Sequence, residues 1–577
     1  MSDKKTNSAR FRLKIDEFDG IDSVAKHKNP LGSSQIVNFR IDKNGSLKKR
    51  CGFKFLLQTD YDIDGVWYGK LFGKNRLILV SNSTIYQYVD STLSIIGQID
   101  NLSDGEFSMF YYDECLYFLD SRGIYRLNDS GFSTPICYAP LIGKDWDCGW
   151  LGEINEKKNL LSDYVRISYL IRSNHVNFLR LTEPVERVVS VYRNGTPLSE
   201  SDYTLDNDNM VIIVDSMNEG DSFEVTLKYF KSTDALSIDA RSATRCTLFG
   251  GIEKKRPYFW GSTCGDSIYV CKHLSVEQKS DVERHLSCVP FYVTEDDIIK
   301  VGTGNHKVMA LTKHLGRTLI FTENDAWRAS EEGEAALESD SNDIRISDIA
   351  PISINTAIGV RTVNGVVLAD NDPISIGDHS LFRWTSNTDE LDEQNAYSIS
   401  SAIDPLLTEK FREKSAIYFD RKRKEIYLYS NTLGSKVWVW QKSSGKWVCF
   451  EGFVPTHIFE YDSETAFVSG NVICVFYDYL TNDDNTEIKA YFTSNPIDFG
   501  SLEDKHLSTL SLRATGDFTV NVFYNGSETP DSSFDMTNVD FGRSKRIFGK
   551  RFKYAELQIV ANGNMRQSIN SVELTAR

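Results

Sequence analysis

The chain has 577 residues, of which 41% are hydrophobic, 12% aromatic and 25% charged, and its formal net charge is −16. This length predicts three or four domains, and the apolar content excludes general disorder. The acidic balance argues against stable binding to nucleic-acid phosphates, although solubility alone also explains it. No run of about 18 apolar residues occurs, so no membrane span is expected, and the N-terminus lacks the apolar stretch of a signal peptide.

Residues 1–34 are polar and locally basic. They predict an N-terminal arm that either docks on a neighbouring subunit or remains a solvated tail. From residue 35 the pattern changes to short alternating strands. Asn44-Gly45 separates two such runs, and this pair predicts a β-hairpin because both residues tolerate a positive φ.

The same hairpin pattern recurs along the chain as an apolar strand, a turn rich in Asp, Asn or Gly, and a second strand. It occurs at residues 75–89, 114–128, 317–330, 364–384 and 416–431. Many short strands are typical of sandwiches, barrels and propellers, and a propeller blade takes about 40–50 residues. Residues 35–155 and 239–480 therefore predict an all-β fold with a β-propeller of roughly six to eight blades.

Residues 156–238 differ from this pattern and predict a small β-sandwich module inserted into the propeller. Two turns, Asn194-Gly195 and Glu219-Gly220, separate strands with regular alternation. The residues expected to face the core of this module are Val189, Val191, Val211, Ile213, Val225 and Leu227.

Helical patterns are few, and residues 275–287 form the one helix expected. The acidic segment 331–343 predicts a solvated loop. Thr481–Glu487 predicts a polar linker, after which residues 488–577 return to alternating strands. Residues 481–577 therefore predict a C-terminal β-sandwich.

The sequence singles out no catalytic, cofactor-binding or metal-binding residue. GxxxxGK[ST], GxSxG and HExxH are all missing from it. His273 and His285 flank the expected helix without a zinc-like pattern, and the ten cysteines contain no CxxC pair. The acidic stretch 387–395 invites a calcium interpretation, but it lacks the glycine and the terminal glutamate of an EF-hand in register. We therefore expect a protein without a cofactor that is not an enzyme.

Three tryptophans, Trp438, Trp440 and Trp447, lie in one predicted hairpin. If these side chains were exposed to solvent, they would stack on sugars or bases. Trp438 and Trp440 share one face of a strand, and packing in the core of a blade is the interpretation we favour.

Several passages resemble the tail nozzle and hub proteins of tailed bacteriophages, a β-propeller family that stabilises packaged DNA. A "G-x-L-x-x-R-x-G" turn stands near the N-terminus, and a run with "iFte..iw" lies in mid-chain. A further match opens the C-terminal sandwich, whereas Cys51 stands where the family often has proline. The matching residues are Gly45, Leu47, Arg50, Gly52, Leu319, Ile320, Phe321, Thr322, Glu323, Trp327, Asp498, Phe499, Gly500 and Lys505.

This resemblance implies a structural virion protein of the phage tail, assembled in the host cytoplasm. It implies a homo-oligomeric ring, commonly of six copies, below the portal and adaptor proteins and in contact with tail fibre or spike proteins. Such a ring lines or closes the DNA exit channel, and double-stranded DNA passes through it without specific binding. The alternatives are a receptor- or glycan-binding tail protein, a propeller glycosidase, which would need two carboxylates about 5–10 Å apart, and a host-encoded scaffold propeller.

Overall fold

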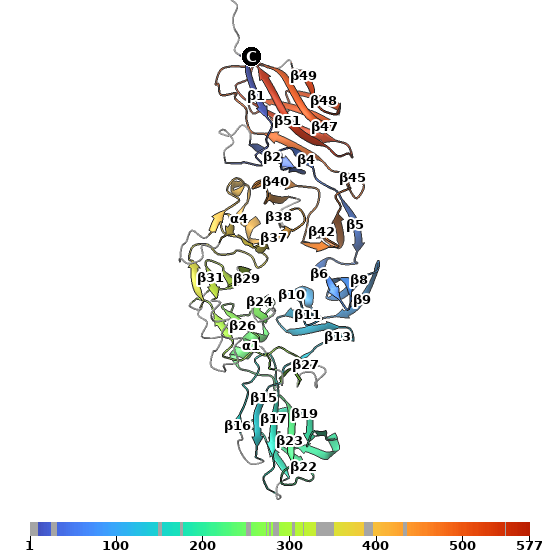
Figure 1. The fold of residues 1–577 in the computed structure, drawn as a ribbon, viewed down its shortest axis with the longest axis vertical. Coiled ribbons are helices and arrows are strands. Elements are labelled where there is room, and N and C mark those ends of the chain that lie inside the picture. Colours follow the sequence, from blue (N-terminus) through green and yellow to red (C-terminus); the bar gives the residue numbers. More distant parts are fainter. Residues whose placement is uncertain are drawn as a thin grey trace, which may run out of the picture. The chain divides into compact units, whose positions relative to one another are not determined.

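The structure is a computed structural model in which nearly every regular element is a β-strand (Figure 1). It describes residues 10–24, 32–147, 153–173, 177–249, 256–272, 274–275, 278–280, 288–302, 306–314, 317–329, 351–385, 396–430, 436–547 and 550–577. Contacts within the chain define two compact units. The first comprises Met1–Tyr68, Leu77–Asn82 and Asn355–Arg577, and the second comprises Gly69–Arg76 and Ser83–Ile354.

Six separate sheets of four strands each are found among the described residues. Five of them use strands that follow one another along the chain. These five are β6 (Ile63–Leu71), β7 (Lys74–Ser81), β8 (Thr84–Val89) and β9 (Thr92–Gln98); β10 (Phe107–Tyr112), β11 (Cys115–Asp120), β12 (Gly123–Asn128) and β13 (Gly131–Ser133); β24 (Arg245–Phe249), β25 (Arg256–Trp260), β26 (Ser267–Val270) and β28 (Ile298–Lys300); β29 (Val308–His314), β30 (Arg317–Thr322), β31 (Ala326–Ala329) and β32 (Ile352–Asn355); β33 (Val366–Ala369), β34 (Asp372–Ile376), β35 (Leu381–Trp384) and β36 (Ala396–Ser398).

The sixth sheet, in the first unit, joins strands from opposite ends of the chain. Its members are β41 (His457–Tyr461), β42 (Glu464–Ser469), β43 (Val472–Phe476) and β5 (Phe53–Gln58). β5 lies antiparallel to β43, with Phe53 opposite Phe476 and Gln58 opposite Val472. Phe53 also makes edge-on ring contacts with Phe467 and Phe476, so the pairing is supported by an aromatic core.

The five recurring hairpins predicted from the sequence are confirmed, because each predicted pair of strands is a pair of neighbours in one sheet. Several tight turns have a positive φ at both central residues, as at Asn82-Ser83 (47° and 64°) and Asp462-Ser463 (49° and 63°). This is the type I′ geometry that matches the twist of the flanking strands, and it explains why Asn and Asp lead these turns.

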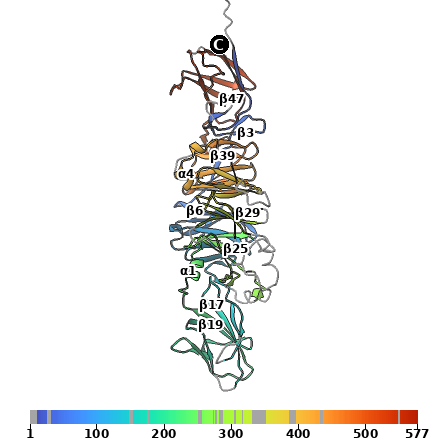
Figure 2. The ribbon, with the colours of Figure 1, turned by 90° about the vertical axis from the view of Figure 1, so that its left-hand side faces the viewer.

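Residues 141–229 of the second unit form two sheets that share one apolar core (Figures 1 and 2). The larger sheet runs β16-β15-β17-β23-β19-β20, and the smaller runs β18-β22-β21. The strands are β15 (Leu141–Trp146), β16 (Glu153–Ile154), β17 (Tyr164–Leu170), β18 (Phe178–Arg180), β19 (Val185–Arg193), β20 (Thr196–Pro197), β21 (Tyr203–Leu205), β22 (Val211–Val214) and β23 (Ser222–Tyr229). The sheets thus include β15, which the sequence analysis placed before the insertion.

The prediction of which residues face the core of this module is wrong in part. Val191, Val225 and Leu227 are buried as expected, but Val189 and Ile213 are each 38% exposed. Irregular pairing between Val188 and Ser190 shifts the alternation of β19. β22 is a run of four apolar residues, so its period alone does not tell which face is buried, and it is Ile212 and Val214 that point inward.

Short elements join the sheets of the second unit. Helix α1 (Ala235–Arg241) begins after Asp234, whose carboxylate accepts a hydrogen bond from the backbone N–H of Ser237. Residues 235–238 thus belong to a helix and not to the predicted β-module. The remaining elements are β14 (Ile136–Cys137), which pairs in parallel with β27 (Cys288–Val289), and the 3-10 helices η1 (Leu102–Asp104) and η2 (Glu200–Asp202). Segment 331–343 and most of the expected helix 275–287 lie outside the described residues.

In the first unit, a 14-stranded sheet runs β3-β4-β51-β47-β50-β46-β2-β40-β39-β38-β37, with β1, β48 and β49 attached at its sides. The strands are β1 (Phe11–Ile15), β2 (Ser33–Val37), β3 (Phe39–Ile41), β4 (Leu47–Lys49), β37 (Ser415–Asp420), β38 (Glu425–Ser430), β39 (Val437–Gln441), β40 (Lys446–Phe450), β46 (Ala490–Ser494), β47 (Leu507–Tyr524), β48 (Ser532–Val539), β49 (Arg543–Arg546), β50 (Ala555–Asn562) and β51 (Ser568–Ala576). The short helices η5 (Asp404–Leu406) and α4 (Glu409–Glu413) precede β37. The hairpin predicted at Asn44-Gly45 is confirmed as β3 and β4.

The long strand β47 changes partners at Gly516. Its first half pairs with β51 and β49, and its second half pairs with β50 and β48. Gly516 has a φ of +117°, a conformation that glycine adopts most easily, and the pairing with β48 shifts register at this position. This glycine thus marks the point where β47 passes from one set of partner strands to the other within the 14-stranded sheet.

Two sequence predictions for the first unit are corrected. Within the predicted arm, β1 pairs with β51 of its own chain, and Phe18 and Ile21 are buried. The predicted linker at residues 481–487 contains a hairpin of β44 (Asn482–Asp483) and β45 (Thr486–Glu487), and Asp483 is buried. Polarity suggested a linker, but this aspartate has a buried cation as its partner. No helix within the described parts of the chain is long and apolar enough to span a membrane.

Candidate functional site

A buried arginine, Arg50, connects four segments of the first unit. Its guanidinium forms two hydrogen bonds with the carboxylate of Asp483, at 2.9 and 2.6 Å. Its other donors reach Asn38 Oδ1 at 2.8 Å and the carbonyls of Cys51 and Glu451 at 3.0 and 3.1 Å. The side chain of Arg50 is 0% exposed and that of Asp483 is 9% exposed. All five donors of the guanidinium are therefore used, as a buried arginine requires.

The N-terminal residues that carried the family resemblance include Arg50 itself, and each of the others has its own structural role. Gly45 has a φ of +75° in the turn between β3 and β4, and Leu47 is fully buried. A Cβ atom at Gly52 would lie 1.8 Å from the backbone oxygen of Asn482 in the β44–β45 hairpin. Each position of this turn therefore has a packing reason.

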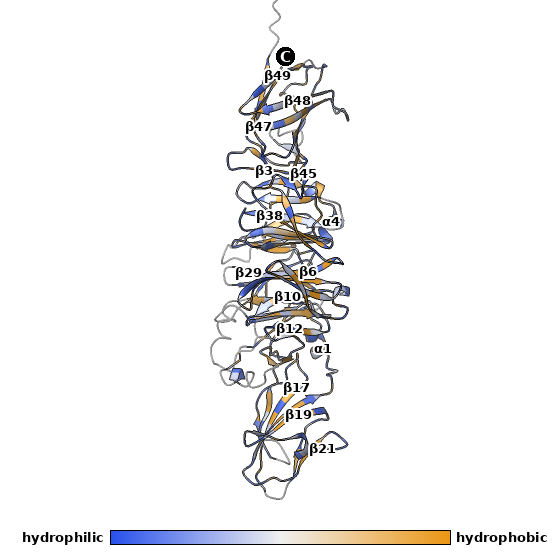
Figure 3. Ribbon diagram, turned by 90° about the vertical axis from the view of Figure 1, so that its right-hand side faces the viewer, coloured by the Kyte–Doolittle hydropathy of each residue, from blue (hydrophilic) through white to orange (hydrophobic). Residues whose placement is uncertain are grey.

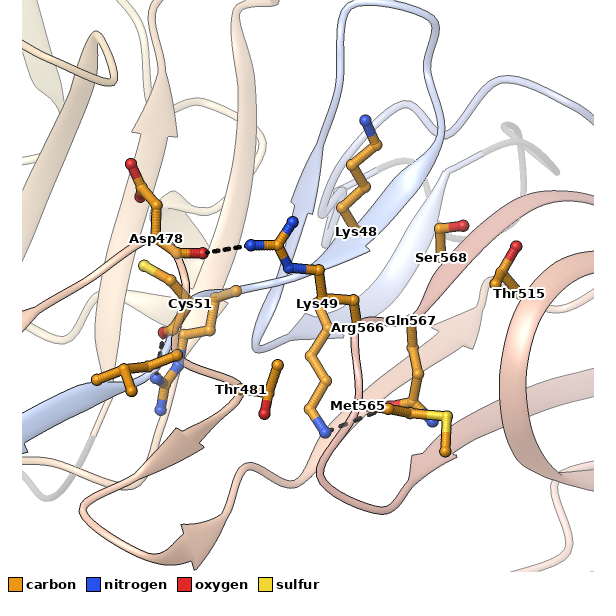
Figure 4. A pocket seen from close by; sticks show the side chains of 12 residues that line it. Lys48, Lys49, Cys51, Asp478, Thr481, Thr515, Met565, Arg566, Gln567 and Ser568 are labelled. Carbon is orange, nitrogen blue, oxygen red and sulfur yellow. Dashed lines mark hydrogen bonds between the residues drawn. The ribbon is translucent and has the colours of Figure 1, made fainter.

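Beside Arg50 lies a cavity of about 330 Å³ between β4, β51 and the segment before β44 (Figure 4). Its lining is rich in cations and hydroxyl groups. The lining residues are Lys48, Lys49, Arg50, Cys51, Asp478, Leu480, Thr481, Thr515, Met565, Arg566, Gln567 and Ser568.

Within the described ranges, two cations of the cavity form hydrogen bonds only with neutral groups. Lys49 Nζ donates to the carbonyl of Gly563 at 2.8 Å and to Gln567 Oε1 at 3.3 Å. Arg566 donates to the carbonyl of Asp478 at 3.2 Å. Burial lowers the pKa of Lys49, and the positive charge of Arg50 acts in the same direction, whereas the carboxylates of Glu487 and Asp483 offset part of this shift. An anion in the cavity would offset that cost.

The remaining charges of the cavity are compensated. Lys48 pairs with Asp42 at 3.2 Å and is mostly exposed. Burial alone would raise the pKa of Asp478, but hydrogen bonds from Lys422 and Arg423 lower it to about 2. In the part of the chain that the structure describes, the hydroxyls of Thr515 and Ser568 have no hydrogen-bond partner. Lysine, arginine and free hydroxyls suit a phosphate or carboxylate group, so the arrangement favours anion binding over catalysis.

A second cavity, of about 280 Å³, lies against strands β2, β39, β40 and β46 of the 14-stranded sheet. Trp438, Cys449, Val37 and Tyr491 follow one another across β39, β40, β2 and β46 in register, so they line one face. Lys436 and Glu451, 3.7 Å apart, stand at its border. Aromatic side chains with polar groups around them suit a small amphipathic ligand.

The other residues named from the sequence have structural surroundings. Trp438, Trp440 and Trp447 are at most 7% exposed, so the prediction that they pack in a core is confirmed. His273, His285 and segment 387–395 lie outside the described residues. Across the described ranges, no group of three or more His, Cys, Asp or Glu side chains is arranged to hold a metal ion.

Sequence reasoning missed the ion pair and the cationic cavity. The run Lys48-Lys49-Arg50 was the one available signal, but such a run is most often a solvated surface. The partners Asp483 and Arg566 lie more than 400 residues away, and no local pattern connects them.

No protein-family model matches the chain, and no curated protein matches it. Among solved structures, the AfRom2 CNH domain is 6% identical with a TM-score of 0.35, over 74% of this chain and 99% of that one. A chain of a mitotic checkpoint complex is 9% identical with a TM-score of 0.34, over 73% and 92%. The extracellular domain of a one-component system from B. thetaiotaomicron is 8% identical with a TM-score of 0.25, over 90% and 78%. Likenesses at these scores assign neither a fold nor a function to the chain.

Proposed function

We propose that this chain is a structural protein of a tailed-bacteriophage virion. It forms a ring of identical copies on the tail axis, below the portal and adaptor, that lines or closes the DNA exit channel. It is not an enzyme, and it helps to retain and eject the genome. Its fold is a β-propeller with an inserted β-module and a C-terminal β-sandwich.

The pairing of β5 with β43 carries this proposal. Four-stranded sheets in chain order are typical of propeller blades, and β5 completes the last sheet before the chain enters β6. With β37–β40 counted as a further blade, the strand order fits seven blades. The hydrogen bonds between β5 and β43 would join the first and last parts of the propeller and keep its circle of blades closed under load.

The family resemblance supplies the link from this fold to a tail. Two residues of the "G-x-L-x-x-R-x-G" turn contact the β44–β45 hairpin: Arg50 pairs with Asp483, and Gly52 lies against the backbone of Asn482. A stiff block of this kind suits a ring that bears the pressure of packaged DNA. Heterologous contacts between identical copies close such a ring.

Electron microscopy of intact particles from the source tests the proposal. We expect a ring of this chain on the tail axis around a channel wide enough for DNA. If the chain is a peripheral appendage or is missing from the particles, the proposal is wrong. Native mass measurement of the purified chain provides an independent count of the copies.

A second candidate, a receptor- or glycan-binding tail protein, is favoured by the cavity beside Trp438. Tyr491 lines this cavity, and among the described residues its hydroxyl has no hydrogen-bond partner. A glycan array with wild type and a Tyr491→Phe variant tests this candidate. Binding that the variant loses would support it, and an array without binding would exclude it for the glycans present.

A further inference from the structure

The segment 541–554 is the most basic part of an otherwise acidic chain. It carries six Lys and Arg residues and no Asp or Glu, whereas the whole chain has a net charge of −16. The residues of β49 are all exposed, and the strand is coloured as hydrophilic in Figure 3. Arg551 and Lys553, which follow in the connection to β50, are exposed as well.

The cations of this segment are mostly unpaired. Lys550 pairs with Asp531 at 3.3 Å. Within the described ranges, no carboxylate lies within ion-pair distance of Arg543, Lys545, Arg546, Arg551 or Lys553. Lys545 lies over the ring of Phe534, at 4.5 Å from its centre.

β47, the neighbouring strand, extends the positive surface. β49 pairs with β47 from Arg546 opposite Thr509 to Arg543 opposite Leu512. Arg513, the next residue of β47, is exposed, and its guanidinium lies 5.8 Å from the ring of Phe541. Glu573 lies near Arg513, but it already pairs with Arg12 at 2.6 Å. Ser511 and Ser544 lie opposite each other and share a hydrogen bond of 2.7 Å on the face that also carries Arg513 and Arg546, whereas Arg543 and Lys545 alternate to the other face of β49.

We propose that this basic strip is a binding surface for the phosphate backbone of double-stranded DNA, without sequence preference. The strip consists of Arg513, Arg543, Lys545, Arg546, Arg551 and Lys553. Exposed lysines, arginines and hydroxyls on a strand are the groups that contact phosphates. Acidic residues elsewhere do not prevent this, because charges separated by more than about 8 Å are largely screened at physiological salt. The inference rests on the proposed function, since a ring on the tail axis meets packaged DNA.

A DNA titration at several salt concentrations tests the strip. Wild-type protein is titrated against a labelled duplex of mixed sequence, and binding is followed by fluorescence anisotropy. If about five phosphates are neutralised, affinity should fall roughly 500-fold between about 50 and 200 mM salt. A variant with Arg543→Gln, Lys545→Gln and Arg546→Gln should lower the magnitude of the log–log salt slope by about 2.7.

The control variant carries Lys54→Gln, Lys70→Gln and Lys300→Gln, three exposed lysines outside the strip. It loses the same charge, so a general effect of net charge would appear in both variants. We expect this control to bind DNA as the wild type does. Equal loss in both variants, or no loss in the first, would overturn the proposal.

Two further measurements distinguish DNA from an acidic protein as the ligand, and the strip from the ring. First, poly-glutamate is titrated in the same assay. Tighter binding of poly-glutamate than of DNA would identify an acidic protein as the ligand of the strip and would overturn the DNA proposal. Native mass of the same sample reports whether the chain forms a ring. A chain that stays monomeric yet binds DNA through the strip would contradict the proposed ring while supporting the strip. A ring that does not bind DNA would support the proposed ring and contradict the DNA-binding strip.

Discussion

Replacing Arg50 by methionine should strongly destabilise the first unit. The substitution keeps much of the side-chain volume, but it leaves the buried carboxylate of Asp483 without its cation. It also removes donors from Asn38 Oδ1 and from two backbone carbonyls. Removal of one partner from a buried ion pair costs about 3–5 kcal/mol. Since a domain is stable by roughly 5–15 kcal/mol, this is a large part of the total.

Hydrogen exchange read by mass spectrometry is the suitable assay, because a chain with two units does not unfold in one step. Peptides that contain β4 and β44 should exchange faster by about two to three and a half orders of magnitude, at about 1.4 kcal/mol per tenfold change. Peptides from β17 and β23 in the other unit serve as the internal reference. The exposed pair Arg12–Glu573 provides the matched control, and Arg12→Met should leave the exchange of the same peptides nearly unchanged.

Two outcomes would refute this reasoning. Arg50→Met with unchanged exchange would mean that the ion pair is not buried as described. A double variant, Arg50→Met with Asp483→Leu, should be more stable than Arg50→Met alone, because no unpaired charge remains. Recovery should be incomplete, since the unpaired carbonyls still cost about 1–3 kcal/mol each. A double variant that is less stable than the single one would assign the loss to packing.

Three further predictions concern the same unit. Gly52→Ala should lower the melting temperature markedly because its Cβ meets the backbone oxygen of Asn482, whereas Gly105→Ala, with open space at its Cβ, should not. Asp478→Asn should cost less than about 1 kcal/mol at pH 6, since the carboxylate is mostly exposed. Because the folded pKa of Asp478 is lowered to about 2, its contribution is present above the unfolded pKa of about 4 and is lost as the pH falls towards 2, so melting curves of wild type and variant should converge there. Cys51→Pro should lower the melting temperature only modestly, because within the described residues the Cys51 N–H donates no hydrogen bond and the substitution removes the contact of its buried Sγ with Arg40 at 3.6 Å.

Local features of the fold were predictable from the sequence, but pairings between distant segments were not. Turns such as Asn44-Gly45 specify hairpins through the φ angles of two residues, so the recurring hairpins were recognised. The pairing of β5 with β43 depends on partners about 400 residues apart, and neither strand contains information about the other. The position of Arg50 inside the core was equally hidden. A lysine- and arginine-rich run normally indicates a surface, and only the distant Asp483 makes burial of the arginine favourable.

The residues that carry the resemblance have structural roles, so the resemblance concerns the fold and does not identify a binding or catalytic group. Gly45, Leu47, Arg50 and Gly52 are fixed by a turn, a core contact, an ion pair and a close backbone approach, and none of these features acts on a ligand. Such positions specify a fold, and different functions can be built on one fold. Chemistry directed outward lies elsewhere, in the cavity beside Arg50 and in the cations of β49. Measurements on those two surfaces, and not on the turn around Gly45, will therefore decide what the chain contacts.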